Sequence, residues 1–164
     1  MTLADKAQDK VARSLNAEGR SLGHVALGAG VAAVLIGVTA ALSARRAPAV
    51  APGGEPVRRP MVKAMWPAVF SVTTLAAMRV WNAPNSRART RALSLWGVLQ
   101  ASNLALTFWR PTGKTEQVLA ATATAGLTAA YARAAADVDQ KAASVAAPSG
   151  FAGLASLAAT PSNS

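Results

Sequence analysis

Residues 22–44 read LGHVALGAGVAAVLIGVTAALSA, a run of 23 residues that contains no Lys, Arg, Asp or Glu. From Val25 to Leu42 the only polar side chain is Thr39. A helix on the surface of a soluble protein needs a polar face, and this run has none. A membrane-spanning helix needs about 20 mostly apolar residues, which this run provides. The run therefore predicts a helix that crosses a membrane, and His24 at its start is expected at the interface.

Charge-poor stretches recur along the rest of the chain. Lys and Arg at their borders can keep their charged heads at the interface while their stems lie along apolar surface. The last stretch is the weakest, because it is rich in Ala and Ser and contains Pro148 and Pro161. The pattern predicts an all-α integral membrane bundle of about five transmembrane helices, near residues 22–44, 63–81, 91–109, 117–136 and 141–160.

The composition excludes several classes of protein. The chain has 164 residues, 17 Lys+Arg, 7 Asp+Glu and no cysteine, so a disulfide scaffold and a Cys-ligated metal site are excluded. His24 is the only histidine, which argues against a His-cluster metal site and a Ser-His-Asp hydrolase. No phosphate loop or catalytic constellation stands out. Asp137 and Asp139 lie two apart, on different faces of a helix, and are expected to be solvated. We therefore expect no enzyme, no metal and no required cofactor.

Residues 1–21 form a polar segment of mixed charge ahead of the apolar runs. Leu3, Ala7, Val11 and Leu15 recur at steps of four, which is typical of an amphipathic helix. Such a helix can lie on a membrane surface. The chain is thus divided into this short helical segment and a single transmembrane domain over 22–164.

The net charge of +10 is distributed over both sides of the predicted bundle. The N-terminal segment and the connections near 82–91 and 137–141 fall on one side, which carries the larger share of Lys and Arg. The positive-inside rule weakly favours a cytoplasmic position for that side. Arg87, Arg89 and Arg91 are expected to meet anionic lipid headgroups rather than nucleic acid.

Several side chains suggest how the helices pack. Small residues on one helix face allow close approach of another helix in lipid, and the first span carries such a face at Ala29, Ala33, Gly37 and Ala41. The four tryptophans, Trp66, Trp81, Trp96 and Trp109, lie near span ends and are expected at headgroup level, as is Tyr131 beside Arg133. Asn103 lies in the middle of the third span, where it either bonds a neighbouring helix or anchors a ligand.

The second and third spans resemble a known family. Residues 65–70 read MWPAVF, residues 75–81 read LAAMRVW, and Ala92-Leu93-Ser94-Leu95-Trp96 leads to Asn103. These stretches resemble the second and third helices of the TspO/MBR family of translocator proteins and tryptophan-rich sensory proteins. The chain departs from the family pattern where it has Leu106, Ser149, Ala152 and Thr160.

The resemblance implies a five-helix bundle, often dimeric, whose cavity binds porphyrin, haem or a sterol-like ligand. Carried over to this chain, it implies that Trp66, Phe70 and Asn103 line or anchor the ligand. Because several cavity residues of the family are replaced, an alternative is a non-catalytic accessory or structural subunit of a larger membrane complex. Both interpretations predict a homo-oligomer or a membrane complex in contact with anionic lipids.

Overall fold

The computed structural model describes residues 3–44, 72–108 and 114–149. Within these ranges every regular element is a helix, which confirms the all-α class. Trp66, Phe70, Trp109 and most of the predicted fifth span lie outside the described residues. The helices are α1 (Leu3–Ser14), α2 (Leu22–Ala44), a helix over 72–82, α4 (Arg87–Phe108), α5 (Lys114–Ala136) and α6 (Gln140–Ala146).

Side-chain caps set the start of three helices. The hydroxyl of Ser21 accepts from the backbone N–H of His24 at 3.3 Å, and that of Ser86 accepts from Arg89 at 3.0 Å. The carboxylate of Asp139 accepts from the N–H groups of Lys141 and Ala142. Each cap satisfies N–H groups that the helix itself leaves without partners.

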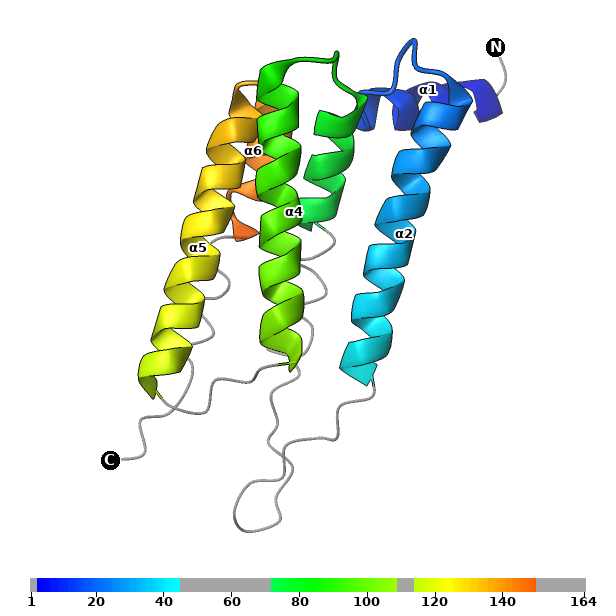
Figure 1. Ribbon diagram of the computed structural model, residues 1–164. Coiled ribbons are helices and arrows are strands. Elements are labelled where there is room, and N and C mark those ends of the chain that lie inside the picture. Colours follow the sequence, from blue (N-terminus) through cyan, green and yellow to red (C-terminus); the bar gives the residue numbers. More distant parts are fainter. Residues whose placement is uncertain (1–2, 45–71, 109–113, 150–164) are drawn as a thin grey trace.

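The long helices lie side by side, and α1 lies across one end of them (Figure 1). α4 packs along α5, and α5 packs along α6. The helix over 72–82 joins both neighbours, because its Trp81 bonds α2 and its Thr73 meets Gln100 of α4. This arrangement places the helix over 72–82 between α2 and α4.

The core between these helices is built mostly from small side chains. Tyr131 is the largest wholly buried side chain, and Leu99 and Val80 follow it, while most other buried apolar residues are alanines. Small side chains let helix backbones approach closely. The expectation that Tyr131 lies at an interface is wrong, because its ring is 0% exposed and packs within the core cluster.

We expect Tyr131→Phe to leave the stability unchanged or raise it by up to about 1 kcal/mol. The hydroxyl is buried and has no hydrogen-bond partner among the described residues, so its removal costs no bond and spares its desolvation. Denaturant titration of the detergent-solubilised protein, followed by circular dichroism, measures the difference. A loss above about 1 kcal/mol would mean that the hydroxyl has a partner.

Within the described ranges, α2 alone is long and apolar enough to cross a membrane, over Leu22–Ala41 with a mean hydropathy of 1.9. α4 and α5 have the length but are less apolar. The apolar side chains of α2 mostly face outward, since Leu27 is 59% and Val34 is 65% exposed. A core helix of a soluble protein would bury them.

Candidate functional site

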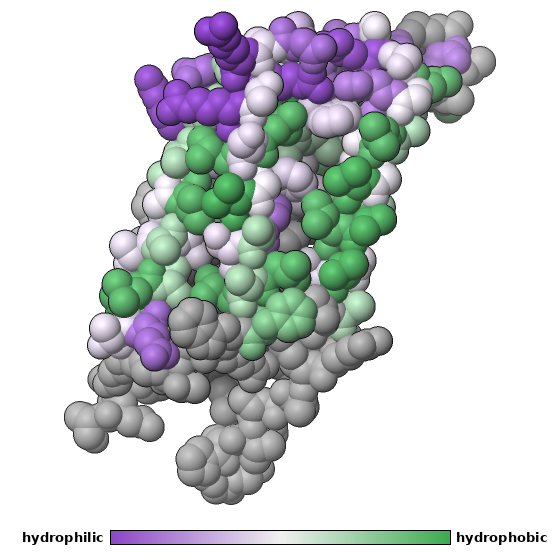
Figure 2. Space-filling view, in the orientation of Figure 1, coloured by the Kyte–Doolittle hydropathy of each residue, from purple (hydrophilic) through white to green (hydrophobic). Residues whose placement is uncertain are grey.

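Two polar connections that are far apart in the sequence meet at one end of the bundle. Asn82 donates from Nδ2 to the carbonyl of Leu15 at 2.9 Å, and Arg20 donates from Nε to the carbonyl of Asn82 at 2.6 Å. Figure 2 shows hydrophilic side chains gathered over this end, with apolar side chains along the helices below it. The connection after residue 82 is thereby tied to the connection between α1 and α2.

Arg79 links three elements at the polar end. Its Nη2 lies 2.7 Å from Oδ2 of Asp139, and the two side chains are only 12% and 10% exposed. Its Nη1 donates to the carbonyls of Arg13 and Ser14 at the end of α1. The prediction that Asp139 is solvated is therefore wrong, whereas Asp137 is exposed.

Trp81 connects the helix over 72–82 to α2 through its contacts with His24. The two rings stack with centroids 5.0 Å apart and an interplanar angle of 14°. The indole Nε1 donates to the carbonyl of His24 at 3.1 Å. Nε2 of His24 lies 3.1 Å from the carbonyl of Trp81, and because a carbonyl only accepts, Nε2 carries the hydrogen. His24 is thus half-buried and bonded within the bundle.

Arg89 lies over the same indole, with its Cζ 5.2 Å from the ring of Trp81. Its Nη1 also donates to the side-chain oxygen of Asn85. Burial, and then the charge of Arg20, lower the pKa of the Arg89 guanidinium, which stays cationic at neutral pH. Arg87 and Arg91 lie four residues apart on α4 and line a shallow groove with Asn85. Arg87, Arg89 and Arg91 were all expected to meet lipid headgroups, but Arg89 lies on a different face of α4 from the other two.

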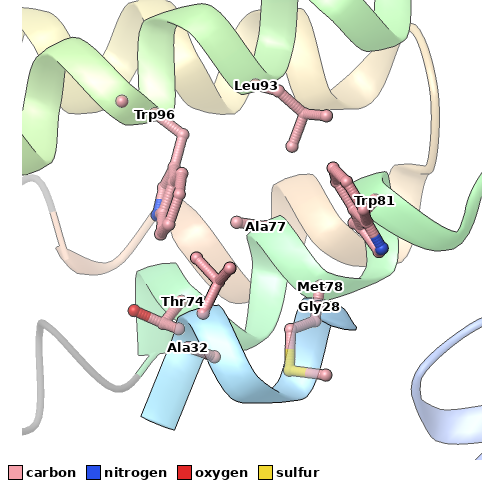
Figure 3. Close-up of a pocket in the computed structure, with 10 residues that line it drawn as sticks. Gly28, Ala32, Thr74, Ala77, Met78, Trp81, Leu93 and Trp96 are labelled. Atoms are coloured by element: carbon pink, nitrogen blue, oxygen red, sulfur yellow. The ribbon is translucent and has the colours of Figure 1, made fainter. Parts of the chain in front are cut away.

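An apolar cavity of about 190 Å³ lies below this polar end, between α2, the helix over 72–82 and α4. Trp81 and Trp96 stand at its two ends (Figure 3). Both indole nitrogens point away from the cavity, so the rings turn carbon atoms toward it. The cavity is lined by Gly28, Val31, Ala32, Thr74, Ala77, Met78, Trp81, Leu93, Trp96 and Gly97. Such a wall suits a ligand that makes no hydrogen bonds inside it.

Of the three residues expected at a ligand site, Asn103 alone lies in the part of the chain that the structure describes. Asn103 is buried on α4, but it does not line the cavity. Trp66 and Phe70 lie outside the described residues. Trp96 lies more than two turns into α4 and lines the cavity. The small residues Ala29, Ala33, Gly37 and Ala41 are exposed on α2.

The cavity depends on two glycines whose significance the sequence pattern does not show. A Cβ atom at Gly28 would lie 2.7 Å from Cδ1 and 2.9 Å from Nε1 of Trp81, which is closer than packed atoms lie. A Cβ at Gly97 would meet nothing within 4 Å, because it would extend into open space. Gly28 therefore lets Trp81 reach α2, and Gly97 leaves the cavity open.

We expect Gly28→Ala to lower the free energy of unfolding by about 1–3 kcal/mol, because the added methyl group displaces Trp81. Gly30→Ala is the matched control, since a Cβ there meets nothing within 4 Å. The control is expected to stabilise by up to about 1 kcal/mol through helix propensity. Denaturant titration measures the change in the free energy of unfolding for both variants, which should have opposite signs. Changes of the same sign would mean that Trp81 can move aside for the added methyl group at little cost.

Among the described residues, His, Asp and Glu side chains form no cluster that could hold a metal ion. The site consists of an apolar cavity, two indoles and an adjacent cationic rim.

No protein-family model matches the chain, and no curated protein or solved structure matches it either.

Proposed function

We propose that the chain is a membrane-embedded helical bundle of the TspO/MBR type that binds a hydrophobic ligand between its helices. The observation that carries this proposal is the cavity between Trp81 and Trp96, whose walls are almost entirely apolar. Support for a membrane location comes from the outward-facing apolar side chains of α2 and from the polar end under α1.

The size of the cavity bears on the kind of ligand. Binding sites for drug-sized molecules usually measure about 300–1,000 Å³. At about 190 Å³ this cavity is smaller. The geometry therefore favours a ligand that inserts a hydrocarbon chain or a single ring over one that buries a whole porphyrin, haem or sterol. No residue in it points to chemistry on the ligand, so the proposed role is binding.

The test uses a fatty acid with a nitroxide on its chain, which quenches tryptophan fluorescence on contact. Protein purified in mild detergent is expected to show saturable quenching, and protoporphyrin IX serves as the comparison ligand. Gly97→Leu should weaken the quenching at least tenfold by filling the cavity. Gly126→Leu, on an open and exposed face of α5, should match the parent protein. Identical quenching in both variants would refute the cavity as the site.

A second candidate function is that of an accessory subunit in a membrane complex. The specific observation is the exposed face of α2 that carries Ala29, Ala33, Gly37 and Ala41. Such a face suits close packing against a helix of another chain, including a second copy. Size-exclusion chromatography with light scattering tests this function. Gly37→Leu should release the partner, and a particle of one chain in the parent protein would contradict it.

A further inference from the structure

The apolar wall of the cavity continues upward to a cationic group on α4. Arg89, Leu93 and Gly97 follow one another at steps of four and share a helix face. Leu93 and Gly97 line the cavity, and Arg89 lies over Trp81 at its polar end. A ligand in the cavity that extended toward the polar end would therefore approach a guanidinium.

The opposite wall of the cavity, on α2, also changes from apolar side chains at the cavity to a cationic side chain at the polar end. Gly28 and Ala32 line the cavity on α2, and His24 lies one turn above them. Arg20 precedes that helix and reaches the carbonyl of Asn82. Both walls thus lead from apolar surface to an arginine at the polar end.

Neither of these two arginines has a carboxylate partner in the described part of the chain. The ion pair of Arg79 with Asp139 involves neither of them, and no carboxylate among the described residues is seen to pair with Arg20 or Arg89. The Nε of Arg89 is buried and has no hydrogen-bond partner there. The charge of Arg20 also contributes to the lowered pKa of Arg89, as expected for two like charges held close together. An anion beside them would relieve this repulsion.

The cavity is open at the side of the bundle. Val31 lines it and is 49% exposed, and Gly97 lines it and is exposed as well. The opening lies between α2 and α4, at the level where the apolar side chains of α2 face outward. In a membrane, a hydrocarbon chain of a neighbouring lipid would reach this opening directly.

We propose that the occupant is an anionic phospholipid, with one acyl chain inserted sideways between α2 and α4 and its phosphate beside Arg20 and Arg89. This rests on the proposed function, a membrane bundle with a hydrophobic ligand site, and it names the class of that ligand. Arg87 and Arg91 take no part, because they lie on the other face of α4.

The test is photo-crosslinking in vesicles of unlabelled phosphatidylcholine. Phosphatidylglycerol with a diazirine on one acyl chain is added at a small mole fraction, and the matched phosphatidylcholine probe serves as the zwitterionic comparison. Mass spectrometry locates the label. We expect about tenfold more label from the phosphatidylglycerol probe on peptides that contain Val31, Leu93 or Gly97, and unlabelled phosphatidylglycerol should compete it away.

Charge variants assign the headgroup site. Arg20→Gln with Arg89→Gln is expected to reduce the phosphatidylglycerol label to the phosphatidylcholine level. Arg20→Lys with Arg89→Lys keeps both charges and should retain most of the preference. Arg87→Gln with Arg91→Gln is the matched control and should retain it fully. In the unaltered protein, the preference should fall as salt is added, which checks the electrostatic cause without any variant.

The outcomes separate this inference from the proposed function. Equal labelling by both probes would overturn the anionic phospholipid, while the hydrophobic site would stand if Gly97→Leu still abolished the label. Label that Gly97→Leu leaves unchanged would overturn both. Loss of the preference in the Arg87 and Arg91 variant, but not in the Arg20 and Arg89 variant, would also overturn the headgroup assignment.

Discussion

Arg79→Met is expected to lower the free energy of unfolding by about 3–5 kcal/mol. The substitution leaves the carboxylate of Asp139 largely buried without its cation, and breaking a buried pair from one side costs about this much. It also removes the donor to the carbonyls of Arg13 and Ser14 at the end of α1. Denaturant titration in mild detergent, followed by circular dichroism, measures the loss.

A double-mutant cycle separates the ion pair from the rest of the effect. Asp139→Asn removes the charge but keeps a good helix cap, so the double variant should recover part of the stability that Arg79→Met loses. Arg87→Met is the control, because Arg87 is exposed and should change the stability by less than about 0.5 kcal/mol. Additive losses in the cycle would show that Arg79 and Asp139 do not interact.

Charged residues at the borders of apolar runs predicted the ends of one helix correctly and the start of another incorrectly. The run over 22–44 matches α2 at both ends. The predicted span at 91–109 begins one turn late, because α4 already begins at Arg87, after the cap from Ser86. Arginines can occupy a first helical turn at only a small cost against the helix dipole, so a charged residue at the border of an apolar run does not mark the start of the helix. Of the five predicted spans, α2 alone meets both the length and the apolarity of a membrane helix in the described ranges.

The site was harder to predict, because it depends on contacts between distant residues. The spacing of Trp81 and Trp96 in the sequence does not show that they stand at opposite ends of one cavity. The absence of a side chain at Gly28 matters only because Trp81 lies against it. One signal was available in the sequence: the step of four from Arg89 to Leu93 puts a charge directly above an apolar helix face. For Asp139, spacing alone could not reveal a partner 60 residues earlier in the chain.

Trp81→Ala is expected to cost about 3–5 kcal/mol in the free energy of unfolding and to abolish labelling of the cavity by the diazirine phospholipid. The indole packs against Gly28, stacks on His24 and donates to the carbonyl of that residue. Its loss leaves the carbonyl without this donor and opens one end of the cavity. Because Trp81 fastens α2 to the helix over 72–82, amide hydrogen exchange should also accelerate along α2.

Trp96→Ala is the matched comparison, because Trp96 also lines the cavity but its Nε1 makes no hydrogen bond among the described residues. It should weaken ligand binding while leaving hydrogen exchange in α2 unchanged. Trp81→Phe keeps an aromatic ring for His24 but removes the N–H, so it should cost only about 1 kcal/mol. If Trp81→Ala and Trp96→Ala accelerated hydrogen exchange in α2 equally, the indole of Trp81 would only line the cavity. It would then not be the contact that holds α2 against the helix over 72–82. The order of the three variants thus distinguishes the binding role of the indoles from the structural role of one of them.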